Sequence, residues 1–180
     1  PPGQVALTVA YHSNVVVRNV EIVHDGAHGM FIDNADDIHI SNVSVTNVHP
    51  VTPLPAQPEQ TNIVIINTDR PVVDHVRLRG GTSGIYILNG TGVKFSCIEG
   101  YDFRGLGVRG NLVQFNNSQN CLLEDFSVVN NSSPAISWPG DNVSFITSHN
   151  CIARRGLIDG NNSKTGVGVM FESSNNGLVE

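Results

Sequence analysis

Apolar and polar residues alternate with a period of two in short stretches along most of the chain. Val15 and Val17, like Val43 and Val45, are separated by a single polar or variable residue. This period is typical of a β-strand with one buried face. No window keeps apolar residues at the spacing of an amphipathic helix, and Asn and Gly interrupt every few residues. The pattern predicts an all-β chain with almost no helix.

The strands are predicted to come in threes, as a unit that repeats along the chain. The clearest copy has strands at residues 29–32, 37–40 and 43–45, separated by short polar turns. In four units the first strand begins 14 residues before the third, as from Gly29 to Val43. Only the segment after each third strand varies in length. Such a unit cannot bury its apolar face alone and must stack on copies of itself.

Short strands in coils of 22 or more residues, the spacing from Val76 to Ile98, predict a parallel solenoid. Each strand then pairs with its equivalent one coil away. We expect about six to seven coils in a single domain over residues 1–180. The chain starts one strand before its first full coil and stops at Glu180, where a turn should begin. We therefore expect a fragment of a longer solenoid, truncated at both ends.

Three segments carry a resemblance to a known fold: Gly-Ile-Tyr-Ile at residues 84–87, the run at 120–128 and the run at 168–179. They resemble the right-handed, single-stranded parallel β-helix of the pectin-lyase-like superfamily, although no specific family is identified. The resemblance implies a carbohydrate-active protein that acts on an extended polysaccharide, uronic-acid polymers included. A lyase, an epimerase and a glycoside hydrolase are all compatible with it. It also implies a secreted protein, extracellular or at the cell surface.

Asparagines gather at the predicted turns. Asn14, Asp37, Asn120, Asn142 and Asn176 are placed before second strands. Between second and third strands the turn residue is asparagine in two coils, Asn19 and Asn42, and His75, Cys97 or Asp125 in others. Asn tolerates left-handed backbone geometry, so these positions are predicted to be tight turns.

The composition of the chain argues against two kinds of binding partner, nucleic acids and membranes. The formal net charge is −6 and the ten Lys and Arg residues are mostly scattered, so no nucleic-acid partner is expected. No apolar run reaches the length of a membrane span, so no membrane partner is expected. No cofactor or metal is predicted, because no cluster of calcium ligands accompanies the fold. The three cysteines are read as buried thiols, with a bridge between Cys121 and Cys151 as the alternative.

The variable segments after the third strands are predicted to carry the chemistry. His24, Asp25 and His28 lie within five residues and suit a general base with its orienting carboxylate. A polar turn that uses Gly26 and Gly29 for backbone freedom is the alternative.

A second candidate cluster follows later third strands. Tyr101, Asp102 and Arg104 are taken as catalytic, and Arg79 and Arg109 as substrate-binding. Guanidinium groups bind carboxylates in a fork, which suits an acidic sugar. Arginines that are solvated or already ion-paired are the alternative.

Further substrate-binding candidates are aromatic or lie in the longest loop. His49 stands in the proline-rich segment 47–61, which can wall a groove. Phe31 and Tyr86 belong to an outward column of the first strands that contains Thr8, Val64 and Gln114. Residues 102–115 admit two registers, with either Gly107-Val-Arg or Leu112-Val-Gln-Phe as the first strand. The column either stacks on sugar rings or is covered by another segment or chain.

No complete catalytic signature of a polysaccharide-active family is present, so two functions remain open. One is a polysaccharide-active enzyme. The other is a non-catalytic solenoid segment of a spike, adhesin or passenger protein, which binds glycans or serves as a rod and can form homo-oligomers.

Overall fold

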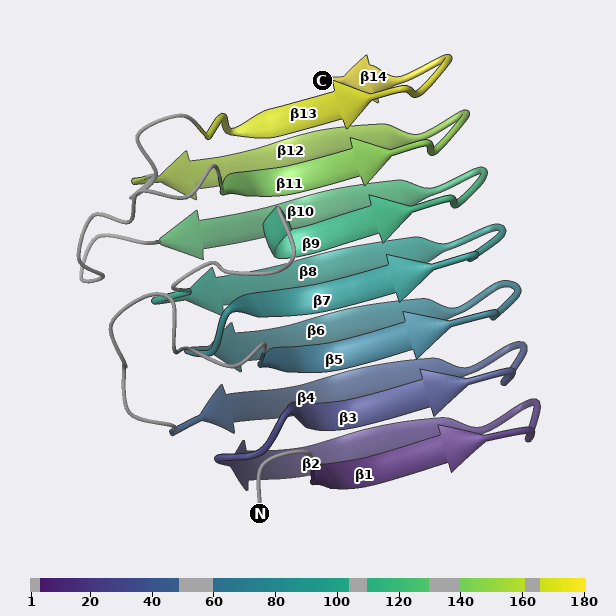
Figure 1. Ribbon diagram of the computed structural model, residues 1–180, viewed down its shortest axis with the longest axis vertical. Coiled ribbons are helices and arrows are strands. Elements are labelled where there is room, and N and C mark those ends of the chain that lie inside the picture. The colour runs from purple at the N-terminus through teal and green to yellow at the C-terminus, as the bar shows by residue number, and fades with distance from the viewer. Residues whose placement is uncertain (1–3, 49–59, 104–109, 130–139, 161–165) are drawn as a thin grey trace.

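The computed structural model describes residues 4–48, 60–103, 110–129, 140–160 and 166–180, and within them every regular element is a strand. The strands form two parallel sheets that stack coil on coil (Figure 1). The first-strand sheet contains β1 (Val5–Ala10), β3 (His28–Asp33), β5 (Thr61–Ile66), β7 (Ser83–Leu88), β9 (Gly110–Asn116), β11 (Asp141–Ile146) and β13 (Val169–Glu172). The bent sheet contains β2 (Val16–His24), β4 (His39–Asn47), β6 (Val72–Arg79), β8 (Lys94–Tyr101), β10 (Leu122–Val129), β12 (Ile152–Asp159) and β14 (Leu178–Val179). The predicted all-β parallel solenoid is confirmed.

The predicted second and third strands form one continuous strand in each coil, which is a correction to the three-strand unit. The residue at the junction is left-handed, and pairing resumes on both sides of it, as Ser41 with Asp74 and Val43 with Val76. A single left-handed residue therefore bends the strand without ending it. The junction residues and their φ angles are Asn19 (57°), Asn42 (49°), His75 (50°), Cys97 (53°), Asp125 (53°) and Arg155 (52°).

The turns before the second strands are also left-handed, as predicted, with one exception. Asn14, Asp37, Asn120 and Asn176 have φ angles of 59°, 54°, 55° and 56°. The prediction was wrong for Asn142, which lies inside β11. The turn of that coil is held by Asn150 (φ 56°). Abundant asparagines made the two positions hard to distinguish in the sequence.

The core is a set of stacked columns inside the coils. The predicted 14-residue spacing is confirmed, because Val20, Val43, Val76 and Ile98 are paired in register. A second column is a ladder of aromatic rings, which starts at Phe95 in the bent sheet and continues through three rings of the first-strand sheet. The ring centroids of Phe95 and Phe115 lie 5.5 Å apart, those of Phe115 and Phe145 4.6 Å, and those of Phe145 and Phe171 4.5 Å. Stacked rings fill the interior with few voids.

The coil for which the sequence admitted two registers has β9 as its first strand. Strand β9 contains Leu112 and Val113, both fully buried, and Val113 pairs with Ile85. Gln114 pairs with Tyr86, as the predicted outward column requires. The alternative first strand, Gly107-Val-Arg, falls in residues 104–109, outside the described part of the chain.

The aromatic ladder predicts a large cost for removing a central ring. Phe145 is fully buried and stacks on a ring at each side. Phe145→Ala should lower the free energy of unfolding by about 3–5 kcal/mol, as expected for a large cavity in a packed core. Chemical denaturation measures this change. The control is Leu157→Ala, since Leu157 is 60% exposed and its loss should matter by less than about 0.5 kcal/mol. Equal effects in the two variants would contradict the stacking argument.

Candidate functional site

The outer face of the bent sheet carries two consecutive outward residues in each coil. In an ordinary strand, neighbouring residues point to opposite faces. The left-handed junction breaks this alternation in β6: Val73 and Val76 are buried, while Asp74 and His75 between them both face outward. Polar side chains are therefore denser along the bend than a regular strand allows.

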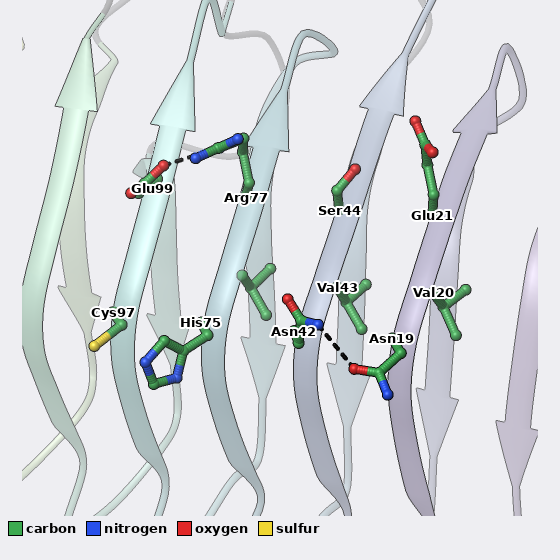
Figure 2. Close-up of a pocket in the computed structure, with 11 residues that line it drawn as sticks. Asn19, Val20, Glu21, Asn42, Val43, Ser44, His75, Arg77, Cys97 and Glu99 are labelled. Atoms are coloured by element: carbon green, nitrogen blue, oxygen red, sulfur yellow. Dashed lines mark hydrogen bonds and ion pairs between the residues drawn. The ribbon is translucent and has the colours of Figure 1, made fainter.

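The bend residues, together with the outward residues two positions after them, line a trough across β2, β4, β6 and β8 (Figure 2). A hollow of about 570 Å³ follows the bend and adjoins a second one of about 410 Å³, because Ser44 and Arg77 line both. Four strands at a spacing of about 4.8 Å span roughly 14 Å along the solenoid. The first hollow is lined by two outward rows, Asn19, Asn42, His75 and Cys97 in one and Glu21, Ser44, Arg77 and Glu99 in the other. The second hollow adds Thr46, Arg79, Tyr101 and Asp102.

Ion pairs between adjacent coils fix the arginines of the trough. Arg77 Nε donates to Glu99 Oε2 at 2.9 Å, and Arg79 Nη2 lies 3.1 Å from Asp102 Oδ2. The Tyr101 hydroxyl donates to Glu99 Oε2 at 3.2 Å. Burial and the nearby Glu99 carboxylate raise the pKa of Tyr101 above its ordinary value. The phenol therefore stays protonated at neutral pH and serves as a hydrogen-bond donor, not as a base.

Beside the bend, one carboxylate holds two imidazoles. Asp74 Oδ2 lies 2.6 Å from His39 Nε2 in the neighbouring coil, and Asp74 Oδ1 lies 2.9 Å from His75 Nδ1. Partial burial raises the pKa of Asp74, but hydrogen bonds from His39 and His75 outweigh it and leave that pKa below its ordinary value. Asp74 is thus an ionised acceptor that orients both rings.

The first predicted catalytic cluster is dispersed over different environments. His24 is buried, with Nε2 3.3 Å from Asn62 Oδ1. Asp25 is exposed. His28 stacks on Phe31, with ring centroids 6.1 Å apart. Burial is the main reason that the pKa of His24 is lowered, which opposes proton uptake in the folded state.

The second predicted cluster is assembled in part. Arg79, Tyr101 and Asp102 line the same hollow, with Arg79 and Asp102 paired across adjacent coils. Arg104 and Arg109, like His49 of the proline-rich loop, lie outside the described residues.

The outward column of the first-strand sheet has the predicted members in register: Thr8, Phe31, Val64, Tyr86 and Gln114. Val64 and Gln114 are only 6% and 5% exposed. Phe31 and Tyr86 are half-buried, and the Tyr86 hydroxyl accepts a hydrogen bond from Asn116 Nδ2 at 3.2 Å. The column therefore offers separate aromatic edges rather than a continuous open face.

Sequence reasoning missed the residues that assemble best: His39, Asp74, His75, Arg77 and Glu99. The signal was present, since His75 and Cys97 had been placed at the bend. What was missing was the consequence that the residue before the bend also faces outward. Cys97 departs from the buried-thiol interpretation, because it is half-buried on the outer face, whereas Cys121 and Cys151 are buried free thiols.

Comparison with known proteins identifies the fold family. A family model described as "right handed beta helix region" matches residues 5–180. The chain belongs to this family. Right-handed β-helix domains are found in pectate lyase-like, carbohydrate-active proteins. A search of curated proteins gave no match.

The described part of this β-helix contains neither a cluster of metal ligands nor a membrane-spanning helix. In the described ranges, no group of three or more His, Cys, Asp and Glu side chains is arranged to hold a metal ion. The same ranges contain no helix with the length and apolar character needed to cross a membrane.

Buried His24 predicts a pH-dependent stability. Its folded-state pKa is below the ordinary 6.5, so the unfolded chain binds this proton more readily. The stability from neutral His24 is present above about pH 6.5 and is lost as the pH falls through the folded-state pKa. Denaturation between about pH 7.5 and about pH 5 should show a smaller loss for His24→Gln than for the unsubstituted chain. His12→Gln, at an exposed histidine, is the control and should retain the full loss.

Proposed function

We propose that this β-helix binds an extended, hydroxyl-rich glycan in the trough of the bent sheet. The observation that carries the proposal is the double row of mostly polar side chains across four coils, which contains both hydrogen-bond donors and acceptors. Sugar hydroxyls both donate and accept hydrogen bonds, so they match a surface on which guanidinium, carboxylate, amide and hydroxyl groups lie side by side. The trough runs along the solenoid, which suits a linear polymer.

The ion pairs favour a neutral glycan over a polyuronate. Arg77 and Arg79 are already paired with Glu99 and Asp102, so a ligand carboxylate would have to displace a protein carboxylate. The hollows also contain Glu21, which adds negative charge. A paired guanidinium and carboxylate keep unused donor and acceptor sites in fixed positions, and neighbouring sugar hydroxyls can bridge them.

The geometry supports recognition of the polymer more directly than cleavage of its backbone. A lyase or epimerase needs a base for a carbon-bound proton, and the raised pKa of Tyr101 opposes that role. The predicted catalytic roles of His24, Asp25, His28, Asp102 and Arg104 stay predictions. Binding to a polysaccharide is consistent with the expected extracellular or cell-surface location, which we retain as part of the proposal.

Glycan binding should depend on the trough arginines. Arg77→Ala and Arg79→Ala should each weaken binding by roughly ten-fold or more, since a hydrogen bond to a charged group contributes about 1.5–3 kcal/mol. Affinity electrophoresis against neutral and uronic polysaccharides, followed by calorimetry on the best ligand, measures the change.

The matched control is Arg155→Ala. Arg155 belongs to the same sheet and, like Arg77 and Arg79, is paired with a carboxylate, Asp125 Oδ1 at 2.7 Å, but it does not line the trough. Its loss should leave binding unchanged. The proposal would be overturned if the unsubstituted chain retained no polysaccharide, or if all three variants weakened binding equally. Preferential binding of polyuronates would overturn the neutral assignment alone.

A further inference from the structure

A cysteine, a histidine and an aspartate meet on the outer face of the bent sheet at the wall of the trough. We propose that Cys97, His75 and Asp74 form an acyl-transfer site that hydrolyses esters, with Cys97 as nucleophile, His75 as general base and Asp74 as its positioning residue. The identification of the ester as an acyl substituent on the bound glycan rests on the proposed function. The assignment of Cys97 as a nucleophile does not depend on the glycan.

The base is already oriented. Asp74 Oδ1 lies 2.9 Å from His75 Nδ1, and the other carboxylate oxygen is held at 2.6 Å by His39 Nε2. An ionised carboxylate accepts the Nδ1 proton of a neutral imidazole, which leaves the lone pair on Nε2. His75 lines the hollow, and in this tautomer its Nε2 has the lone pair that a general base requires.

Cys97 occupies the position next to His75 in the adjacent coil. The residues on either side of the two are paired in register, Asp74 with Ser96 and Val76 with Ile98. Adjacent strands are about 4.8 Å apart, so the two outward side chains leave the sheet as direct neighbours. Figure 2 shows the two residues on adjacent strands at the hollow, with the sulfur turned to the side away from the imidazole.

The thiol is free to turn toward the imidazole. Cys97 is half-buried, and no hydrogen bond to its sulfur is found among the described residues. Rotation about its Cα–Cβ bond between staggered wells is enough to bring the sulfur toward Nε2. Catalytic hydrogen bonds are often long or unformed before substrate binds, so the present rotamer is compatible with the role.

Two of the carboxylates around Cys97 are held in ion pairs. The carboxylates around Cys97 on the outer face are Asp74, beside His75 in the adjacent coil, Glu99, two residues along the strand, and Asp125, in the next coil. Glu99 is paired with Arg77 at 2.9 Å, and Asp125 with Arg155 at 2.7 Å. Asp74 is held by hydrogen bonds with His39 and His75. Arg77, although paired with Glu99, also lines the hollow with Cys97, which makes its guanidinium the candidate donor to a tetrahedral oxyanion.

The reaction balances without a further reagent. Cys97 sulfur attacks the ester carbonyl carbon while His75 Nε2 takes the thiol proton, and a sulfur–carbon bond forms. The carbon–oxygen ester bond breaks as the imidazolium returns that proton to the leaving alkoxide. Water then attacks the thioester with His75 as base, the sulfur–carbon bond breaks, and the carboxylic acid is released. Cys97 regains its proton.

Thiol chemistry tests the nucleophile on the native chain. Iodoacetamide at neutral pH should modify Cys97, while Cys121 and Cys151 serve as internal controls because they are only 2% and 0% exposed. His75→Ala should slow modification of Cys97 by roughly ten-fold or more, through loss of the base. His12→Ala, at an exposed histidine far along the chain, should not. An unchanged rate in His75→Ala would overturn the proposal.

Ester hydrolysis tests the reaction. With p-nitrophenyl acetate, mass spectrometry of rapidly quenched samples should find an acetyl group on Cys97, and Cys97→Ala should abolish the enzymatic rate. His75→Ala should lower kcat by roughly a hundred-fold or more. Asp74→Asn should lower kcat with KM unchanged, whereas a merely structural role would lower the unfolding midpoint instead. Hydrolysis that survives in Cys97→Ala, or no acetyl group on Cys97, would overturn the site.

The two proposals fail separately. Acetylation of Cys97 without retention of any polysaccharide would leave an esterase site and remove the glycan assignment. Retention of a glycan with no acetyl-enzyme would leave the binding trough and remove the esterase site.

Discussion

The structure depends on one backbone constraint, the left-handed residue at the same point of every coil. Parallel stacking repeats each coil about 4.8 Å from the last, so any bend must recur in register or the hydrogen-bonded ladder is lost. A single residue at φ near 50° provides the bend in β2, β4, β6, β8, β10 and β12. Left-handed geometry costs about 1 kcal/mol or more for most residues, and Asn tolerates it best. Asn19 and Asn42 fit that preference, and the Nδ2 of Asn42 donates to Asn19 Oδ1 at 2.8 Å.

The same constraint creates the functional surface. By interrupting the alternation of side chains, the bend turns two successive residues outward in each coil, and in-register stacking aligns them with their counterparts. Charge pairs between adjacent coils are then almost unavoidable. At the bend they appear as Arg154 with Glu124 and as Arg155 with Asp125. The outward column of the first-strand sheet follows ordinary alternation, with one outward residue at a time, and two of its members, Val64 and Gln114, are nearly covered.

The sequence predicted what local periodicity controls. The 14-residue spacing and the outward column depend on strand alternation and stacking, and both were correct. The site was harder because its contacts between coils join residues 22 to 35 positions apart, as His39 does with Asp74 and Arg77 with Glu99. Neighbouring positions in the sequence were a poor guide to a shared site, since His24 and Asp25 are adjacent but one is buried and the other exposed. A repeat read for its apolar positions alone hides which polar residues become neighbours.

Within this scaffold, the identity of one side chain decides whether a bend position is structural or reactive. In β12, Arg155 binds Asp125 through two of its nitrogens, with Nε 2.7 Å from Oδ1 and Nη2 2.8 Å from Oδ2, so both carboxylate oxygens are engaged. In β6, His75 occupies the same position and meets the neighbouring carboxylate through Nδ1 alone. An imidazole paired at one nitrogen keeps the other for chemistry, whereas a guanidinium cannot give up its proton at all. The bend supplies the placement, and the histidine leaves that placement open to a reacting group.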